Sequence, residues 1–310
     1  MTDTGWLWAI FTVIAAAAQT VRNATQRELT ATLGTVGATQ VRFVFGLPFS
    51  ILFLAGAMLV LERGLPTVPP VFWAWAVLGA SAQFLATALM LKAMGERSFV
   101  VAIAYIKTEP IQVALFGVVL LGEHLTLPLG AAILIATSGV MLMSFKPGAF
   151  QGGIKPTLTG LASGAMFGFS AVGFRGAILS LHEPNFVLAA TFTLVIGLTM
   201  QCAVLTPYLW WRQRETLRAI VAAWRPSLFA GFMGALASQF WYLSFALATA
   251  ASVRTLALVE VLFAQAISKF AFRQPTTPRE VAGVVLIVAG VVLLLWAHSG
   301  SVPGAHFASS

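Results

Sequence analysis

Charged residues are scarce in this chain. Lys, Arg, Asp and Glu make up 9% of its 310 residues, against about 25% in an average soluble domain. Hydrophobic residues make up 59% and the mean hydropathy is +0.90, so too little polar surface remains to cover a water-soluble globule. This shortage excludes an ordinary soluble domain and favours a chain that crosses a lipid bilayer many times.

Cysteine and clustered histidine are also lacking. Cys202 is the only cysteine, which excludes a disulfide within the chain and any thiolate cluster for a metal. The four histidines are scattered, and the sequence contains no phosphate loop, zinc spacing or nucleophile elbow. We therefore expect no metal, no cofactor and no enzymatic activity. No ATP-binding element is recognisable.

Long apolar stretches are abundant. A hydrocarbon core about 30 Å thick requires roughly 20 apolar residues per helix. Ten stretches have that length: 6–26, 38–61, 71–94, 99–121, 126–145, 158–180, 186–211, 227–249, 252–272 and 279–297. The predicted fold class is therefore all-α, a polytopic membrane protein with ten transmembrane helices. No basic segment precedes the first stretch, which argues against a cleavable signal peptide.

Positive charge is distributed unevenly between the two sides of these stretches. Fourteen cations lie in or beside the odd-to-even connections: Arg22, Arg27, Arg42, Lys92, Arg97, Lys146, Lys155, Arg212, Arg214, Arg218, Arg225, Lys269, Arg273 and Arg279. The other side has three, Arg63, Arg175 and Arg254, with Lys107 inside a stretch. The bias predicts a multi-pass protein of the cell (inner) membrane with both termini extracytoplasmic. We interpret the net charge of +8 as basic residues at the membrane edges that orient the protein and contact anionic lipid. No nucleic-acid partner is expected.

The two halves of the chain resemble each other. Gln83 corresponds to Gln239 at an offset of 156 residues, and Arg22 corresponds to Arg175 at an offset of 153. Six further residues recur at an offset of 151, from Glu109, Thr126, Ala131, Gly139, Val140 and Leu142 to Glu260, Thr277, Ala282, Gly290, Val291 and Leu293. We expect one five-helix repeat over 1–148, a second over 149–300 and a disordered tail over 301–310. Because five is odd, the second repeat should insert upside down, as in many transporters, with the substrate site near midplane.

The segment Lys107–Gln112 (KTEPIQ) followed by Leu120–Thr126 (LLGEHLT) resembles the fourth-span signature of the EamA branch of the drug/metabolite transporter superfamily. The resemblance implies two tandem five-span units and a central cavity for export or exchange of small metabolites. It also implies cytoplasmic termini, in contrast to the charge distribution. The second copy departs from the signature, with Glu260-Val261 lacking the proline and Arg273-Gln274 in place of Gly-Glu.

Several polar residues fall inside the apolar stretches, where a bilayer tolerates them only in the bundle interior. Gln19 and Asn23 share one helical stripe, and a second stripe holds Tyr105, Glu109, Gln112 and Phe116. Lys107 projects about 200° from Glu109, so it needs a partner on another helix or lies neutral. The alternative for Lys107 and Glu109 is a buried structural ion pair between helices.

The candidate substrate-binding residues are Gln19, Asn23, Gln83, Tyr105, Glu109, Gln112, Gln239, Tyr242 and Glu260. Glu109, Glu260 and Lys107 are the candidates for proton or ion coupling, and Arg254 could compensate one of the carboxylates. The amides and tyrosines have a second interpretation as hydrogen-bonding contacts between helices. Glu123 and His124 fit an exposed turn at a helix end.

These observations favour a secondary transporter that exports a small amphiphilic metabolite, an amino acid or a related compound, by alternating access. A lipid-substrate flippase or a non-transporting membrane sensor is the alternative. The expected partners are a small-molecule substrate and the lipid bilayer. Gly130, Gly139, Gly283 and Gly290 suit close helix packing, either inside the chain or at a homodimer face.

Overall fold

The computed structural model describes residues 4–96, 105–144, 154–270 and 277–300, and every regular element in these ranges is a helix. The first half contains η1 (Thr4–Trp6), α1 (Leu7–Val44), α2 (Gly46–Leu61), α3 (Pro70–Glu96), α5 (Glu109–Leu121) and α6 (Leu127–Ser144). The second half contains α7 (Ile154–Ser180), α8 (Phe186–Arg212), α9 (Arg214–Ala222), α10 (Trp224–Leu247), α11 (Ala250–Leu256), α12 (Val259–Phe270) and α13 (Pro278–Gly300). The all-α prediction is confirmed. The expected disordered tail at 301–310 lies outside the described residues.

Seven described helices are long and apolar enough to cross a membrane: Val36–Leu61, Pro70–Met90, Leu127–Ser144, Thr157–Ser180, Phe186–Arg212, Trp224–Leu247 and Pro278–Ser299. The apolar helix Glu109–Leu121 is shorter. The expected first span carries the polar stripe, which lowers its hydropathy. The fourth lies partly outside the described residues, and the ninth is divided between α11 and α12. These seven candidate spans support a multi-pass membrane protein.

The connection expected between the first two apolar stretches is wrong. Instead of a loop at 27–37, helix continues on both sides of Gly34, whose backbone has φ 66° and ψ 175°. This combination is essentially restricted to glycine, because a Cβ would collide with the backbone. A single residue therefore interrupts α1. The helix before Gly34 extends beyond residue 26, where the apolar stretch ends, and includes the polar residues that follow it.

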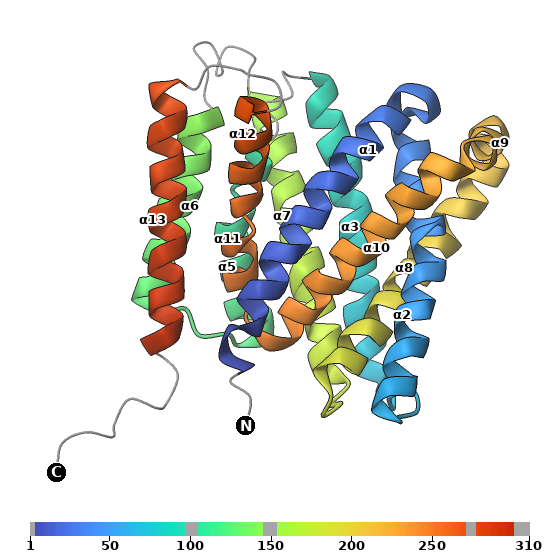
Figure 1. Ribbon diagram of the computed structural model, residues 1–310, viewed down its shortest axis with the longest axis horizontal. Helices are drawn as coiled ribbons and strands as arrows, with labels where there is room; N and C mark the ends of the chain where they lie inside the picture. The colour runs from blue at the N-terminus through green and yellow to red at the C-terminus, as the bar shows by residue number, and fades with distance from the viewer. Residues whose placement is uncertain (1–3, 97–104, 145–153, 271–276, 301–310) are drawn as a thin grey trace.

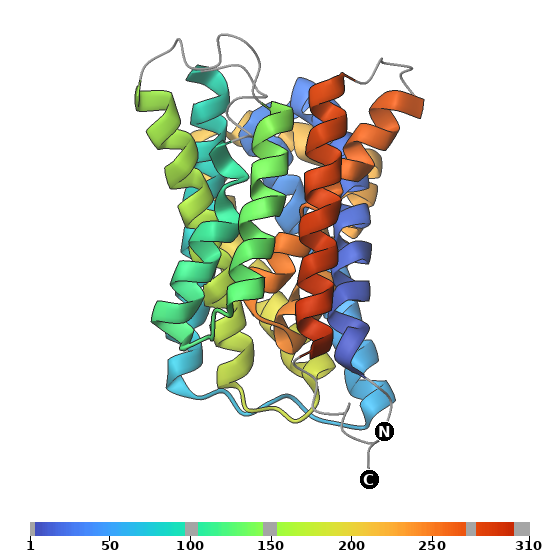
Figure 2. The same ribbon diagram turned by 90° about the vertical axis from the view of Figure 1, so that its left-hand side faces the viewer.

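Three long helix pairs form the frame of the bundle. α1 packs along α10, α3 along α7 and α6 along α13, as Figures 1 and 2 show. In the last pair the backbones approach closely, since a Cβ on Gly139 would lie 2.6 Å from the carbonyl oxygen of Gly283. These two glycines thus serve a contact inside the chain, whereas Gly130 faces open space. The start of α1 and the end of α13 lie at the same end of the bundle (Figure 1).

The main hydrophobic core lies toward the end of the bundle where α1 begins. Its largest fully buried members include Trp8, Phe72, Phe174 and Leu188, which come from α1, α3, α7 and α8. A smaller cluster at the opposite end joins α1 to α8, α9 and α10. The end that contains the chain's first helical turn is therefore the more densely sealed one, and the polar residues of α1 lie between the two clusters.

The amphipathic helix α9 lies at the edge of the bundle, next to exposed tryptophans. Trp210, Trp211 and Trp224 are 64%, 74% and 51% exposed. Three arginines sit over these rings at 4.5–5.6 Å from the ring centroids: Arg212, Arg214 and Arg225. Tryptophan and arginine gather at headgroup level in membrane proteins. This arrangement is typical of a segment that lies at the membrane interface.

Candidate functional site

Two helices are interrupted at matching points of the two halves. Residues 105–106 are helical, and α5 then begins at Glu109, while α11 ends at Leu256 and α12 begins at Val259. Tight three-residue hydrogen bonds occur at both points, from Thr108 N–H to the Tyr105 carbonyl (3.3 Å) and from Leu258 N–H to the Thr255 carbonyl (3.1 Å). Interrupted helices inside a membrane usually line a cavity or a binding site, because their freed backbone groups need partners.

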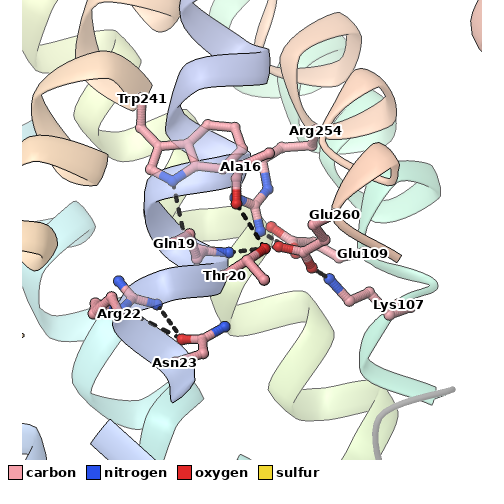
Figure 3. A network of polar contacts seen from close by, with 10 residues as sticks. All are labelled: Ala16, Gln19, Thr20, Arg22, Asn23, Lys107, Glu109, Trp241, Arg254 and Glu260. Atoms are coloured by element: carbon pink, nitrogen blue, oxygen red, sulfur yellow. Dashed lines mark hydrogen bonds and ion pairs between the residues drawn. The ribbon is translucent and has the colours of Figure 1, made fainter. Parts of the chain in front are cut away.

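Two ion pairs connect these interruptions across the halves. Nη2 of Arg254 in α11 donates to Oε2 of Glu109 at 2.6 Å, and Lys107 pairs with Glu260 of α12. Figure 3 shows the four side chains converging on one point. The sequence prediction that Lys107 finds its partner on another helix is confirmed, and Arg254 compensates Glu109. Each half thus supplies one cation and one carboxylate.

Gln19 and Trp241 extend this cluster to the long helices α1 and α10. The amide Nε2 of Gln19 donates to Oε2 of Glu260 at 2.7 Å, and Nε1 of Trp241 donates to Oε1 of Gln19 at 3.1 Å. The guanidinium of Arg254 lies 5.2 Å from the centroid of the Trp241 ring, a cation–π distance. The site therefore joins elements from four separated parts of the chain, as Figure 3 shows.

The charges of the cluster are largely shielded from solvent. The side chain of Glu109 is 5% exposed and that of Glu260 is 13% exposed, while both cations are 19% exposed. Oε1 of Glu109 is buried without a hydrogen-bond partner. Removing one member of a buried pair typically costs about 3–5 kcal/mol, because the other charge remains uncompensated. Separating either pair without replacing the lost counter-charge would therefore be costly.

Three predicted site residues lie outside this cluster and join helices instead. Oε1 of Gln83 accepts a hydrogen bond from Gln201 of α8, and Nε2 of Gln239 donates to Oγ1 of Thr191 at 2.7 Å. The ring of Tyr242 packs on Phe174 of α7, with centroids 4.9 Å apart. These contacts correspond to the alternative interpretation of the amides and tyrosines as contacts between helices.

The predicted stripe along the fourth span is divided. Tyr105 packs against Gly160 of α7, and Nε2 of Gln112 donates to the Leu161 carbonyl at 3.4 Å. Three residues advance a helix by about 300°, so Gln112 lies about 60° from Glu109 around the axis. Because of this rotation and the interruption before Glu109, the carboxylate faces α11 while its predicted neighbours face α7.

Asn23 lies one turn beyond Gln19 on α1, and its side chain binds Arg22. Its Oδ1 accepts hydrogen bonds from Nε and Nη2 of Arg22 at 3.3 and 2.8 Å (Figure 3). The charge pattern places Arg22 among the cations at the membrane edge, but the residue is only 7% exposed. The cause is the length of α1, which continues to the Gly34 turn and carries Arg22 into the bundle.

The expectation of an exposed turn at Glu123 is wrong. Its carboxylate is 9% exposed and pairs with Arg175, which also donates to the Phe245 carbonyl. Gly122 explains this, because its φ of +65° ends α5 with a left-handed residue and turns the following side chain inward. The nearby Gly117 leaves room, since a Cβ there would lie 2.5 Å from Oε2 of Glu123. The Leu-Gly-Glu motif therefore closes the sealed end of the bundle. His124 is exposed, as expected.

The fold and the comparisons together define the class of protein. The chain is a helical membrane protein built from two tandem copies of one unit, and it carries buried charges between the copies. The model of the EamA-like transporter family matches residues 4–145 and again 155–296. The chain belongs to the EamA-like transporter family, and it is thus a membrane transporter of the drug/metabolite transporter superfamily.

The remaining comparisons add the fold alone. A crystal structure of another protein is similar to this chain with a TM-score of 0.66 and 16% sequence identity. The similarity covers 97% of this chain and 99% of that one. No curated protein sequence matches the chain. Among the described residues, no group of three or more His, Cys, Asp or Glu is placed to hold a metal ion.

Proposed function

We propose that the protein is a secondary transporter that exports a small amphiphilic metabolite, an amino acid or a related compound, by alternating access. Its ten spans would form two inverted five-helix halves. The first span is α1 before Gly34, the fourth ends with α5, and the ninth is α11 with α12. Five crossings per half oblige the second half to run opposite to the first.

The packing of the helices supports inverted halves. If α1, α2, α3 and α6 exchange with α7, α8, α10 and α13, then the contact of α3 with α7 becomes that of α10 with α1. The contact of α2 with α10 becomes that of α8 with α3, and the pair α6 and α13 maps onto itself. All of these contacts exist in the structure. A two-fold relation between the halves has this property.

The observation that carries the proposal is the pair of ion bridges between the halves. Lys107 and Glu109 belong to the first half, and Arg254 and Glu260 belong to the second. Rocking of one half against the other would separate them, so the bridges hold one conformation closed. We assign proton or substrate-amine binding to Glu109 and Glu260, with Lys107 as their competitor. Gln19 and Asn23 are assigned to orienting the substrate along α1.

We also propose that the end rich in cationic connections faces the cytoplasm. Arg22 and Arg42 do not count toward this bias, because they extend from α1 into the bundle beside Gly234. The remaining cations of that end still outnumber those of the other. The densely packed core then lies on the extracytoplasmic side. The described conformation would accordingly be sealed toward the outside.

The orientation predicts the result of a topology measurement. A reporter that is active only in the cytoplasm should be inactive when fused to either terminus, and a reporter that is active only outside should be active at both. A fusion inside the connection 213–223 is the internal control and should give the opposite result. Cytoplasmic readings at both termini would reverse the assignment of inside and outside, and would leave the inverted halves intact.

Export predicts a change in metabolite distribution. Cells that express the wild-type protein should lose at least one small metabolite from the cytosol and gain it in the medium, relative to cells that express Glu260→Gln at equal membrane abundance. The reason is that Glu260 exchanges partners during transport, whereas an amide cannot carry the charge. Untargeted mass spectrometry of both compartments measures the effect. Identical profiles for wild type, Glu260→Gln and empty vector would sink the proposal.

One observation favours the lipid flippase as a second candidate. A cleft of about 470 Å³ lies between α1 and the α9–α10 corner. Its lining is mostly small and apolar: Thr25, Leu29, Thr32, Leu33, Ala219, Ala222, Ala223 and Pro226. A flippase would move a labelled lipid between the leaflets of protein-containing vesicles and would leave the metabolite profile of the medium unchanged, so the two assays separate the candidates.

A further inference from the structure

Two arginines inside the bundle have no acidic partner among the side chains that the structure describes. Arg22 is 7% exposed, and neither Arg22 nor Arg42 belongs to any of the four ion pairs among the described residues. Nη1 of Arg22 and Nε of Arg42 are buried without a hydrogen-bond partner. A cation in the interior of a membrane protein is costly unless an opposite charge compensates it. Ionisable residues in such an environment are candidates for a functional role.

The two arginines lie together beside α10. Gly234 has no side chain, and a Cβ at this position would lie 3.3 Å from Cγ of Arg42 and 3.5 Å from Cδ of Arg22. Arg22 is also within electrostatic range of Arg42 and Arg254. Guanidinium groups repel one another when they gather in a medium of low dielectric constant, so an anion between them would relieve the repulsion.

The repeat provides a comparison for Arg22 in the second half of the chain. Arg22 corresponds to Arg175 in the second half. Arg175 is neutralised by Glu123, but the residue that corresponds to Glu123 at an offset of 151 is Gln274. Arg175 therefore has a carboxylate partner, Glu123. For Arg22, the corresponding sequence position holds the neutral amide of Gln274. The first copy thus has an arginine at position 22 with no carboxylate at the sequence position that corresponds to Glu123.

We propose that Arg22 and Arg42 bind an oxyanion group, a carboxylate or a phosphate, of the transported molecule. This inference rests on the proposed function and specifies the charge of its substrate. The planar guanidinium binds two oxygens of such a group at once. Arg22 follows Gln19 by one helical turn (Figure 3), so the oxyanion would lie next to the bridges between the halves. The remainder of the molecule could then reach Glu260.

The binding test uses the whole protein in nanodiscs of phosphatidylcholine. Inorganic phosphate and acetate are the probes, and chloride at equal ionic strength is the reference. We expect phosphate or acetate to raise the Tm in a saturable manner, because a ligand that binds only the folded state stabilises it. Arg22→Gln and Arg42→Gln should each weaken the apparent affinity at least tenfold. Arg218→Gln removes the same charge from an exposed position on α9 and should change it less than twofold.

A second variant separates binding from folding. Asn23→Asp places a carboxylate on the atom position that already accepts two hydrogen bonds from Arg22. It should raise the Tm without any added anion, because it supplies the missing charge, and it should weaken oxyanion binding at least tenfold. A merely structural role for Arg22 and Asn23 predicts that the variant leaves oxyanion binding unchanged.

Several results would overturn the inference. Equal stabilisation by chloride, or equal loss in Arg218→Gln, would indicate a general ionic effect. Stabilisation that requires phosphatidylglycerol in the nanodisc and is absent with soluble phosphate and acetate would assign the oxyanion to a lipid headgroup. The transport proposal has an independent readout: oxyanion binding without metabolite export would defeat the transport function, and export that survives Arg22→Gln and Arg42→Gln would defeat the subsite.

Discussion

Glu109→Gln should destabilise the protein by about 3–5 kcal/mol, because it leaves Arg254 without a counter-charge in a largely buried site. The amide keeps the volume of the side chain and one hydrogen bond, so the loss of stability reports the removal of the charge. Transport should be abolished. The measurements are thermal unfolding of the purified protein and metabolite export at matched membrane abundance.

The double variant Glu109→Gln/Arg254→Gln is the control for this expectation. Removing both charges should restore most of the stability, since no uncompensated ion remains, while transport should stay absent. Rescue by changing Lys107 is not expected, because Lys107 pairs with Glu260. If Glu109→Gln were fully stable and fully active, neither a structural nor a transport role for the carboxylate could be maintained.

The equivalent change at Glu260 should cause a smaller loss. Its carboxylate is 13% exposed, against 5% for Glu109. We expect Glu260→Gln to impair transport less than Glu109→Gln by about 1.4 kcal/mol, the value of one pKa unit of interaction. Equal losses in the two variants would remove this asymmetry and leave the paired site in place.

Arg175→Gln should cost a similar 3–5 kcal/mol, because Glu123 and the Phe245 carbonyl both lose a buried charged donor. Since this pair closes the sealed end of the bundle, we also expect the variant to open that end to water-soluble labels. The matched control is Arg63→Gln. Arg63 pairs with Glu183 at 2.9 Å on the same end, but its side chain is 49% exposed.

Exposed pairs contribute only about 0–1 kcal/mol, so Arg63→Gln should be nearly neutral. Thermal unfolding and maleimide accessibility of single cysteines introduced near Trp8, in a background lacking Cys202, measure the two effects. Equal stability losses in Arg175→Gln and Arg63→Gln would show that burial does not govern these bridges. Unchanged accessibility in Arg175→Gln would show that the pair is no gate.

Much of the fold could be predicted from the sequence, because apolar length, charge bias and repeated residues are properties of the chain itself. The family assignment followed from the Glu109–Pro110 and Leu121–Glu123 segments, and the pairing of Lys107 with another helix followed from its angle to Glu109. The bounds of α1 could not be predicted in the same way. Hydropathy places a loop where apolar residues end, whereas one glycine in an unusual conformation allows helix to continue through polar sequence.

The site was predicted only in part, for a different physical reason. A stripe on a helical wheel assumes an uninterrupted helix, and the break before Glu109 separates its direction from those of Tyr105 and Gln112. A polar residue inside a membrane protein can line a binding site or join two helices, and the sequence alone does not reveal which partner lies opposite. Gln83 and Gln239 found partners on α8, whereas Gln19 found a carboxylate.

The turn at Gly34 constrains how the gene can change. Every missense change of a glycine codon introduces a residue with a Cβ, and each such residue would introduce about 1–3 kcal/mol of backbone strain at this position. A connection of ordinary length would absorb insertions and substitutions freely. Here the turn between the two parts of α1 depends on one residue, so a substitution at Gly34 would disturb the relative placement of Arg22 and Arg42, which lie on either side of it.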